Sequence, residues 1–420
     1  MPVDAASQAE REQIERPDGA DLVVGILDAE HAGESGAILA MAREALGGLT
    51  GISRAVVLCN NGVLSPDPVV PEAQGADVAP SVILLNLQAP DAAEPHPRSR
   101  FQAYRSVLAT AAKLEARACA VIASAPHAAM PQWIYRLVQP ILELGFDLVA
   151  PHYTRHRMEG LLNTSILSPL CRALYGEHLQ NPMGPDFAVS AKLLQLLLDQ
   201  DPGVHRGNGG NVAASIASTA ICGGLQVCES HLGARAQPPT DWMNVSSLLA
   251  EVLGPVFLDV ERQAASWQKI RGSRPTPGFG SPEEVTEVSG VVDVHRMIES
   301  FQLGAQTLQE IWGIVLPPTT LLELRRLSRL PPDHFRMPDE LWVRIVYDFA
   351  LGHRLRTISR DHLLRSLTPL YLGWIASYAL QVETAGPAEI EARIEQLSKA
   401  FETSKPYLVS RWRWPDRFNP

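Results

Sequence analysis

Short apolar runs alternate with amphipathic segments over the first half of the chain, and this alternation strongly limits the possible folds. The runs are rich in Val, Ile and Leu, as is typical of strands buried on both faces of a parallel sheet. Segments with apolar residues at helical spacing lie between several of them. The expected strands are 21–27, 54–60, 81–87, 119–123 and 146–153, and the expected helices 36–49, 100–116 and 131–144. Such βαβ units predict a mostly parallel sheet with helices on both faces.

The second half of the chain has a different character. After a looser stretch with helices at 191–199 and 211–223 and a strand at 225–233, the segments beyond Pro238 follow a helical pattern. These are 241–270, 291–313, 318–330, 338–355, 360–382 and 387–403. Seven of the eight tryptophans lie past residue 240, which favours helices packed through large aromatic faces. We therefore expect a disordered lead at 1–20, an α/β domain at 21–240 and an α-helical domain at 241–420.

Charge and composition exclude several classes of protein. A net charge of −10 disfavours a protein that coats nucleic-acid phosphates. The five cysteines match no zinc-site spacing, and with no secretory leader they suggest reduced thiols and a cytoplasmic location. The best candidate for a membrane span, 367–382, is shorter than the ~20 apolar residues that a span requires. We read it as a buried helix.

The most specific stretch is 147–190, which reads as a strand, a helix and a turn. The strand delivers Arg155 and His156 at its carboxyl end, the helix carries Asn163 and Thr164, and the turn "NPMGPDF" presents Asp186. Arginine and histidine at the carboxyl edge of a parallel sheet suit a carboxylate or phosphate ligand. A solvated loop whose arginines pair with surface acids explains the spacing about equally well.

This stretch resembles the glucosyl-3-phosphoglycerate synthase and mannosylglycerate synthase group of retaining glycosyltransferases. The sharpest likeness lies in "PLCRALYG" and "GPDF", and a weaker one extends over most of 20–420. The resemblance implies a GT-A-like fold with an α-helical C-terminal portion, a nucleotide-sugar donor and a small anionic, glycerate-type acceptor. It assigns acceptor binding to Arg155, His156, Asn163 and Thr164, nucleotide binding to Asp28, Glu30 and Asn60, and a catalytic role to Asp186.

The chain departs from the family where the metal should be bound. Alignment on "PQWI" places Ala123, Ser124 and Ala125 at the family's Asp-x-Asp, whose carboxylates hold Mg²⁺ or Mn²⁺ against the diphosphate. The metal-binding histidine is replaced by Gln237. The sequence therefore predicts that no divalent metal serves as cofactor.

Two interpretations of this departure remain. In one, a cation such as Arg100, His127 or Arg235 stabilises the leaving diphosphate, so Arg100 and His127 are catalytic candidates. In the other, the fold is a catalytically silent binding or scaffold protein. We favour an enzyme that transfers a hexose to an anionic acceptor with retention. The sequence predicts neither a nucleic-acid partner nor a membrane span, and leaves open a homo-oligomer formed through the helical region.

Overall fold

A computed structural model describes most of the chain. The described residues are 19–27, 35–59, 81–86, 100–123, 130–199, 212–234, 242, 245–281 and 292–415. They form two compact units, which we describe one at a time. The α/β unit takes the described residues up to Thr154, those between Met183 and Gln237, and those between Pro277 and Glu283. The helical unit takes the rest, including Arg155–Pro182, which the sequence analysis placed in the first domain.

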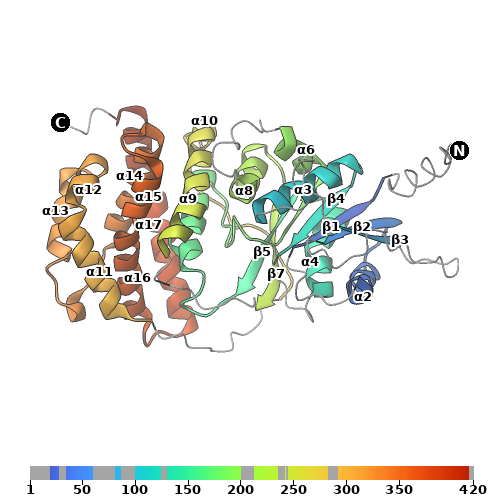
Figure 1. The fold of residues 1–420 in the computed structure, drawn as a ribbon, viewed down its shortest axis with the longest axis horizontal. Coiled ribbons are helices and arrows are strands. Elements are labelled where there is room, and N and C mark those ends of the chain that lie inside the picture. Colours follow the sequence, from blue (N-terminus) through green and yellow to red (C-terminus); the bar gives the residue numbers. More distant parts are fainter. Residues whose placement is uncertain are drawn as a thin grey trace, which may run out of the picture. The chain divides into compact units, whose positions relative to one another are not determined.

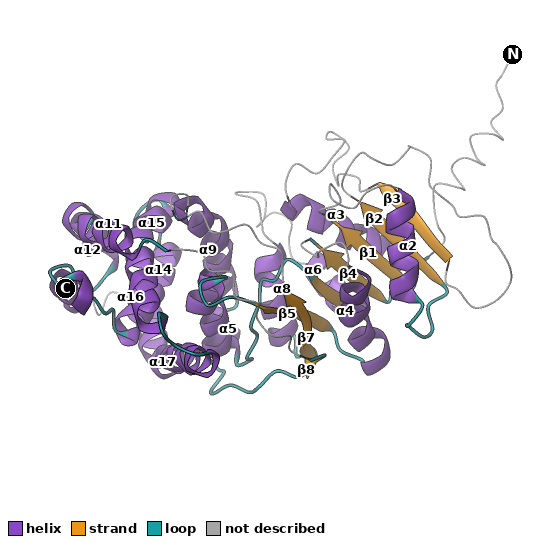
Figure 2. Ribbon diagram, turned by 90° about the horizontal axis from the view of Figure 1, so that it is seen from below, coloured by secondary structure: helices purple, strands orange, loops and turns teal. Residues whose placement is uncertain are grey.

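The α/β unit is built on an eight-stranded, mostly parallel sheet in the order β3-β2-β1-β4-β6-β5-β7-β8 (Figure 2). Only β6 runs antiparallel to its neighbours, between β4 and β5. The predicted α/β architecture is confirmed. The strands are β1 Leu22–Ile26, β2 Arg54–Cys59, β3 Ser81–Asn86, β4 Ala118–Ile122, β5 Leu148–Thr154, β6 Phe187–Ser190, β7 Val227–Ala234 and β8 Gly278–Phe279.

Two strands were missed from the sequence, β6 and β8. With four and two residues respectively, they are too short to show a periodic pattern. β6 follows the "GPD" turn directly, and β8 lies in a segment rich in Gly and Pro. Their place in the sheet depends on pairing with β4, β5 and β7, which are distant in sequence.

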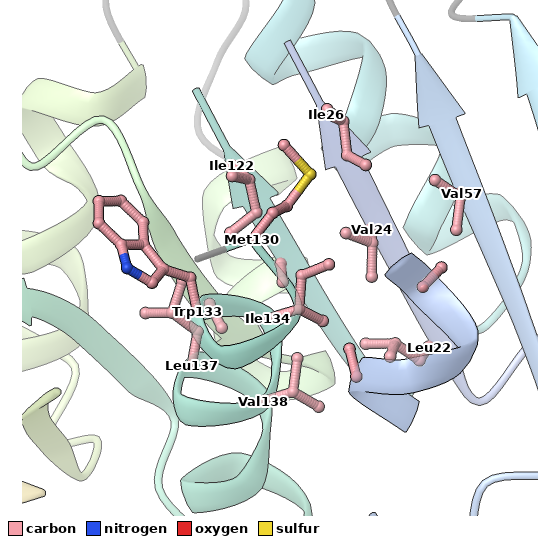
Figure 3. Packing of buried hydrophobic residues seen from close by; sticks show 14 of the residues in the cluster. Leu22, Val24, Ile26, Val57, Ile122, Met130, Trp133, Ile134, Leu137 and Val138 are labelled. Carbon is pink, nitrogen blue, oxygen red and sulfur yellow. The ribbon is translucent and has the colours of Figure 1, made fainter. Parts of the chain in front are cut away.

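Helices cover both faces of the sheet, α2 and α4 on one and α3, α6 and α8 on the other (Figure 1). Figure 3 shows the α4 side, where the apolar stripe of α4 packs against alternate residues of β1 and β4. These side chains are almost fully buried, which stabilises this layer through the hydrophobic effect. The helices are α2 Ser35–Leu46, α3 Arg100–Lys113, α4 Met130–Leu144, α6 Ala191–Asp199 and α8 Val212–Cys222.

A buried aspartate fixes the start of β5 against its neighbours. Asp147 accepts hydrogen bonds from the Ser190 hydroxyl at 2.7 Å and from the Gln226 backbone N–H at 3.1 Å. A single carboxylate thus joins the end of β6 and the residue before β7 to the start of β5. These bonds fix the position at which β5 begins within the sheet.

The helical unit contains α5 and the helices of the C-terminal half. Three of the predicted helices are each divided into two shorter helices. Residues 241–270 form α9 and α10, 291–313 form α11 and α12, and 360–382 form α15 and α16. The elements are the π-helical turn Asn163–Leu167, α5 Ser168–Tyr175, α9 Val245–Arg262, α10 Ala264–Trp267, α11 Val294–Thr307, α12 Gln309–Val315, α13 Pro318–Leu327, the 3-10 turn Pro332–His334, α14 Asp339–Leu355, α15 Arg360–Ser366, α16 Thr368–Val382 and α17 Pro387–Arg413. No helix in the described ranges is long and apolar enough to cross a membrane.

Charged side chains fasten α17 to α5. Arg172, within "PLCRALYG", donates to Glu395 at 2.6 Å and lies 2.9 Å from a Glu402 oxygen. Lys405 donates to the backbone carbonyls of Leu174 at 3.2 Å and Ile270 at 2.8 Å. The "PLCRALYG" segment therefore forms part of a helix–helix junction within this unit.

Lys405 makes the stability of the protein depend on pH in the alkaline range. Burial lowers its pKa to about 8, although the charge of Glu402 acts in the opposite direction. Between pH 8 and about 10 the unfolded chain binds more protons than the folded one, so the free energy of unfolding rises with pH. We expect a rise of about 2 kcal/mol in this window, since one pKa unit corresponds to about 1.4 kcal/mol.

Urea denaturation between pH 7 and pH 10 tests this expectation. The Lys405→Met variant should lack the Lys405 contribution, so the difference in stability between wild type and variant should grow with pH. Parallel pH profiles for the two proteins would contradict it.

Candidate functional site

A buried carboxylate lies at the carboxyl ends of β4 and β5. Asp186 is 0% exposed and comes immediately before β6. Its Oδ1 accepts a hydrogen bond of 2.6 Å from the Ala123 backbone N–H, and its Oδ2 accepts one of 2.5 Å from the Tyr153 hydroxyl. Asp186 therefore joins the residue that follows β4 to the carboxyl end of β5.

Aromatic packing holds the partners of Asp186 in place. The Trp133 ring of α4 lies 5.7 Å from the Tyr153 ring, measured between centroids. On the other side, Tyr104 of α3 donates its hydroxyl to the Pro185 carbonyl at 3.3 Å and packs edge-on against Phe187 at 5.7 Å. The carboxylate thus has a fixed orientation at the edge of the sheet where open α/β folds bind ligands.

The loop 155–160 begins directly after β5 and belongs to the helical unit. The His156 backbone N–H donates to Glu159 at 3.2 Å, and His156 Nδ1 accepts from the Met158 N–H at 3.3 Å. Arg155 folds across Gly160, whose φ of +63° favours glycine, and a Cβ at Gly160 would overlap the Arg155 guanidinium. The loop therefore sets the direction of Arg155 through its own backbone.

The two predicted acceptor residues on the next helix form local hydrogen bonds. Asn163 donates its amide to the Gln180 carbonyl, and Thr164 donates its hydroxyl to the Leu161 carbonyl at 3.4 Å. Asn163 also begins the π-helical turn Asn163–Leu167, a rare geometry that often occurs at functional sites. The structure thus gives Asn163 a role in tying the helix to the segment after α5.

Sequence reasoning missed a cluster of titratable groups on β5 and β7. The rings of His152 and His231 lie 4.2 Å apart, and His152 Nδ1 is 3.5 Å from a carboxylate oxygen of the buried Glu229. Arg136 of α4 donates to the His231 carbonyl at 2.6 Å. Burial, with smaller contributions from the charges of His152 and Arg136, lowers the pKa of His231. Only the pairing of His152 with His231 across parallel strands brings these groups together, and the sequence does not reveal that register.

The predicted site residues divide between the two units. Asp186 lies in the α/β unit, whereas Arg155, His156, Asn163 and Thr164 lie in the helical unit. Arg100 is the first residue of α3, and its side chain is outside the described part of the structure. The remaining candidates lie outside the described residues and stay predictions: Asp28, Glu30, Asn60, His127 and Arg235.

Comparison with known proteins gives a structural likeness alone. No family model and no curated protein matches the sequence. Among solved structures, the chain is similar to glucosyl-3-phosphoglycerate synthase from Mycobacterium tuberculosis in complex with Mn²⁺, UDP and phosphoglyceric acid. The identity is 18% and the TM-score 0.38, over 62% of this chain and 84% of that chain. A structure described as a mycobacterial protein has 18% identity and a TM-score of 0.39, over 61% and 80%.

One prediction needs correction, namely that no divalent metal serves as cofactor. It is contradicted by the glucosyl-3-phosphoglycerate synthase structures, one of which was solved with Mn²⁺ and UDP and another with Mg²⁺ and UDP (18% identity, TM-score 0.37). Within the described residues, no group of three or more His, Cys, Asp or Glu side chains is arranged to hold a metal. Residues 124–129, which follow β4 and include Ser124 and Ala125 of the aligned Asp-x-Asp, lie outside that description. The loss of two carboxylates from the sequence was therefore insufficient ground for excluding a metal.

Proposed function

We propose that this protein is a glycosyltransferase that moves a hexose from a nucleotide sugar to a small acceptor carrying a carboxylate or phosphate, with retention. The observation that carries the proposal is the continuous segment 147–190. In it, β5 leads directly into the loop that orients Arg155, and the chain returns at Asp186 beside the end of β5. A guanidinium directly after the carboxyl end of a parallel strand suits recognition of an anionic substrate.

Each of these residues has a distinct task in the proposal. The guanidinium of Arg155 presents paired N–H donors, a geometry that matches carboxylate and phosphate oxygens. Asp186 acts as a positioning residue, because its carboxylate accepts from Ala123 and Tyr153 and so holds the ends of β4 and β5. His156, Asn163 and Thr164 lie in the same segment. In the proposal they also bind the acceptor.

The donor side requires positive charge, because cleavage of the glycosidic bond leaves a nucleoside diphosphate. A bound divalent metal would supply that charge as a Lewis acid. Since the described residues contain no fitting cluster, we assign no metal ligands and derive no catalytic step through the ion.

One observation favours a second candidate function, a catalytically silent binding or scaffold protein on the same fold. Ala123 stands where the family has a metal-binding carboxylate, and its backbone N–H is engaged by Asp186. In this arrangement the N–H group that follows β4 already has a hydrogen-bond partner inside the protein. Such a protein would bind its anionic ligand without transferring a sugar.

A product assay separates the two candidates. The protein is incubated with UDP-glucose or GDP-mannose and 3-phosphoglycerate or glycerate, each with Mn²⁺, with Mg²⁺ and without added metal. Mass spectrometry should detect the hexosylated acceptor, and NMR of the product should show an α-anomeric proton. Ligand binding without product under every metal condition would establish the silent candidate, and the absence of both binding and product would refute both.

A further inference from the structure

Three stacked aromatic side chains form a ladder inside the helical unit: Trp342 of α14, with Trp374 and Tyr378 of α16. The centroids of Trp342 and Trp374 lie 5.9 Å apart with planes at 29°, and those of Trp374 and Tyr378 lie 5.2 Å apart at 12°. All three side chains are at most 2% exposed. The ring contact between Trp342 and Trp374 joins α14 to α16.

One end of the ladder is bonded to the π-helical turn. The indole Nε1–H of Trp342 donates to the Ser165 backbone carbonyl at 3.1 Å, and this bond is buried. Ser165 lies in the turn Asn163–Leu167, one residue beyond Thr164. The ladder therefore reaches the helix that carries the proposed acceptor residues.

The other end of the ladder is bonded to the loop 155–160. The Tyr378 hydroxyl donates to the Arg157 carbonyl at 3.3 Å. The Arg157 guanidinium in turn donates to the carbonyls of Val382 at 2.7 Å and Glu383 at 3.0 Å, where α16 ends. A cation at a helix C-terminus is favoured by the helix dipole and by the unpaired carbonyls there. The loop is thus held twice to the helix that carries Tyr378.

We propose that this ladder is a positioning device for the acceptor segment. It fixes the loop that orients Arg155 and the turn that begins at Asn163 relative to each other, through Tyr378 at one end and Trp342 at the other. Both are positioning residues, since neither is required to touch a ligand. The proposal rests on the proposed function for its consequence in binding, but the ladder itself can be tested without any ligand.

The competing explanation is that the ladder is ordinary core packing with incidental hydrogen bonds. The chain offers matched controls for this. Trp312 also donates its buried indole N–H to a serine carbonyl, that of Ser366, at 3.0 Å. Tyr347 also donates a buried hydroxyl to a carbonyl, that of Phe401, at 2.6 Å. Trp312→Phe and Tyr347→Phe therefore remove the same groups elsewhere in the same unit.

The first measurement is amide hydrogen exchange of the full-length protein. The N–H groups of Glu159, Asn163 and Thr164 bond to carbonyls inside the segment at 2.9 to 3.1 Å. In Trp342→Phe and Tyr378→Phe, their exchange should be at least about fivefold faster than in wild type, the effect of losing one hydrogen bond. In the two control variants, exchange at these three amides should stay unchanged.

The second measurement is the affinity for an anion, with 3-phosphoglycerate and inorganic phosphate as probes in calorimetry. The ladder variants should bind roughly 5- to 10-fold more weakly, while the control variants match wild type. If wild type binds neither anion, the proposed function fails and the exchange data alone decide the ladder. If the ladder variants exchange no faster at these amides than the controls, the ladder is packing and the proposal is overturned.

Discussion

Asp186→Ala should lower the free energy of unfolding of the α/β unit by about 3–5 kcal/mol. The substitution leaves the buried Ala123 N–H and Tyr153 O–H without the acceptors they have in the structure. An unsatisfied buried donor costs about 1–3 kcal/mol, and bonds to a charged acceptor lie at the upper end of the range. Urea denaturation measures the loss.

Two further variants show whether this loss comes from the carboxylate. Tyr153→Phe removes one of the two bonds and should cost about 1–2 kcal/mol. Asp186→Asn keeps one acceptor oxygen and should fall between Tyr153→Phe and Asp186→Ala. If Asp186→Ala were as stable as Tyr153→Phe, the carboxylate would not be the group that holds the ends of β4 and β5 together.

Arg155→Ala should weaken binding of 3-phosphoglycerate by roughly 10- to 100-fold. This corresponds to the ~1.5–3 kcal/mol of a hydrogen bond between charged groups. Arg155→Lys should recover only part of the affinity, because an ammonium group lacks the planar fork of the guanidinium. Gly160→Ala should have a similar effect to Arg155→Ala, since a Cβ there meets the Arg155 side chain and the φ of +63° strains any other residue. Calorimetric titration measures all three.

A control is needed for the general loss of a positive charge. Arg274 pairs with Glu177 in the same unit and its side chain is 73% exposed. Arg274→Ala should leave the affinity for the anion at the wild-type value. Equal weakening by Arg274→Ala and Arg155→Ala would mean that net charge, and not the loop 155–160, attracts the ligand.

The strands and helices that the sequence predicted share one property, a pattern confined to a single segment. β1, β2 and β4 are continuous apolar runs, which indicates strands buried on both faces. α4 has apolar residues at helical spacing, which indicates a helix buried on one face. β6 lacks such a signal, because its four residues could equally continue a turn. Its antiparallel insertion depends on an edge of β4 and an edge of β5 that exist only after the sheet has assembled.

The candidate site shows the same division. The sequence predicted that Arg155 would lie at the carboxyl end of a strand, Asn163 on the following helix and Asp186 in a turn, because the positions of these elements depend on local pattern. It did not predict that Asn163 bonds to Gln180, or that Asp186 holds Ala123 and Tyr153. It also led to a wrong conclusion about metal, because a missing motif is silent about ligands contributed from elsewhere in the chain.

By itself, then, the sequence determined the longer strands and the helical regions, because hydrophobic periodicity and turn residues act over a few neighbouring positions. Only the tertiary structure decided the partners of those residues. Arg172 meets Glu395 and Glu402 across more than 220 positions, and Trp342 meets the carbonyl of Ser165 across 177. Such contacts form when buried polar groups must find hydrogen-bond partners inside a packed interior, and that requirement is met by spatial neighbours whatever their distance along the chain.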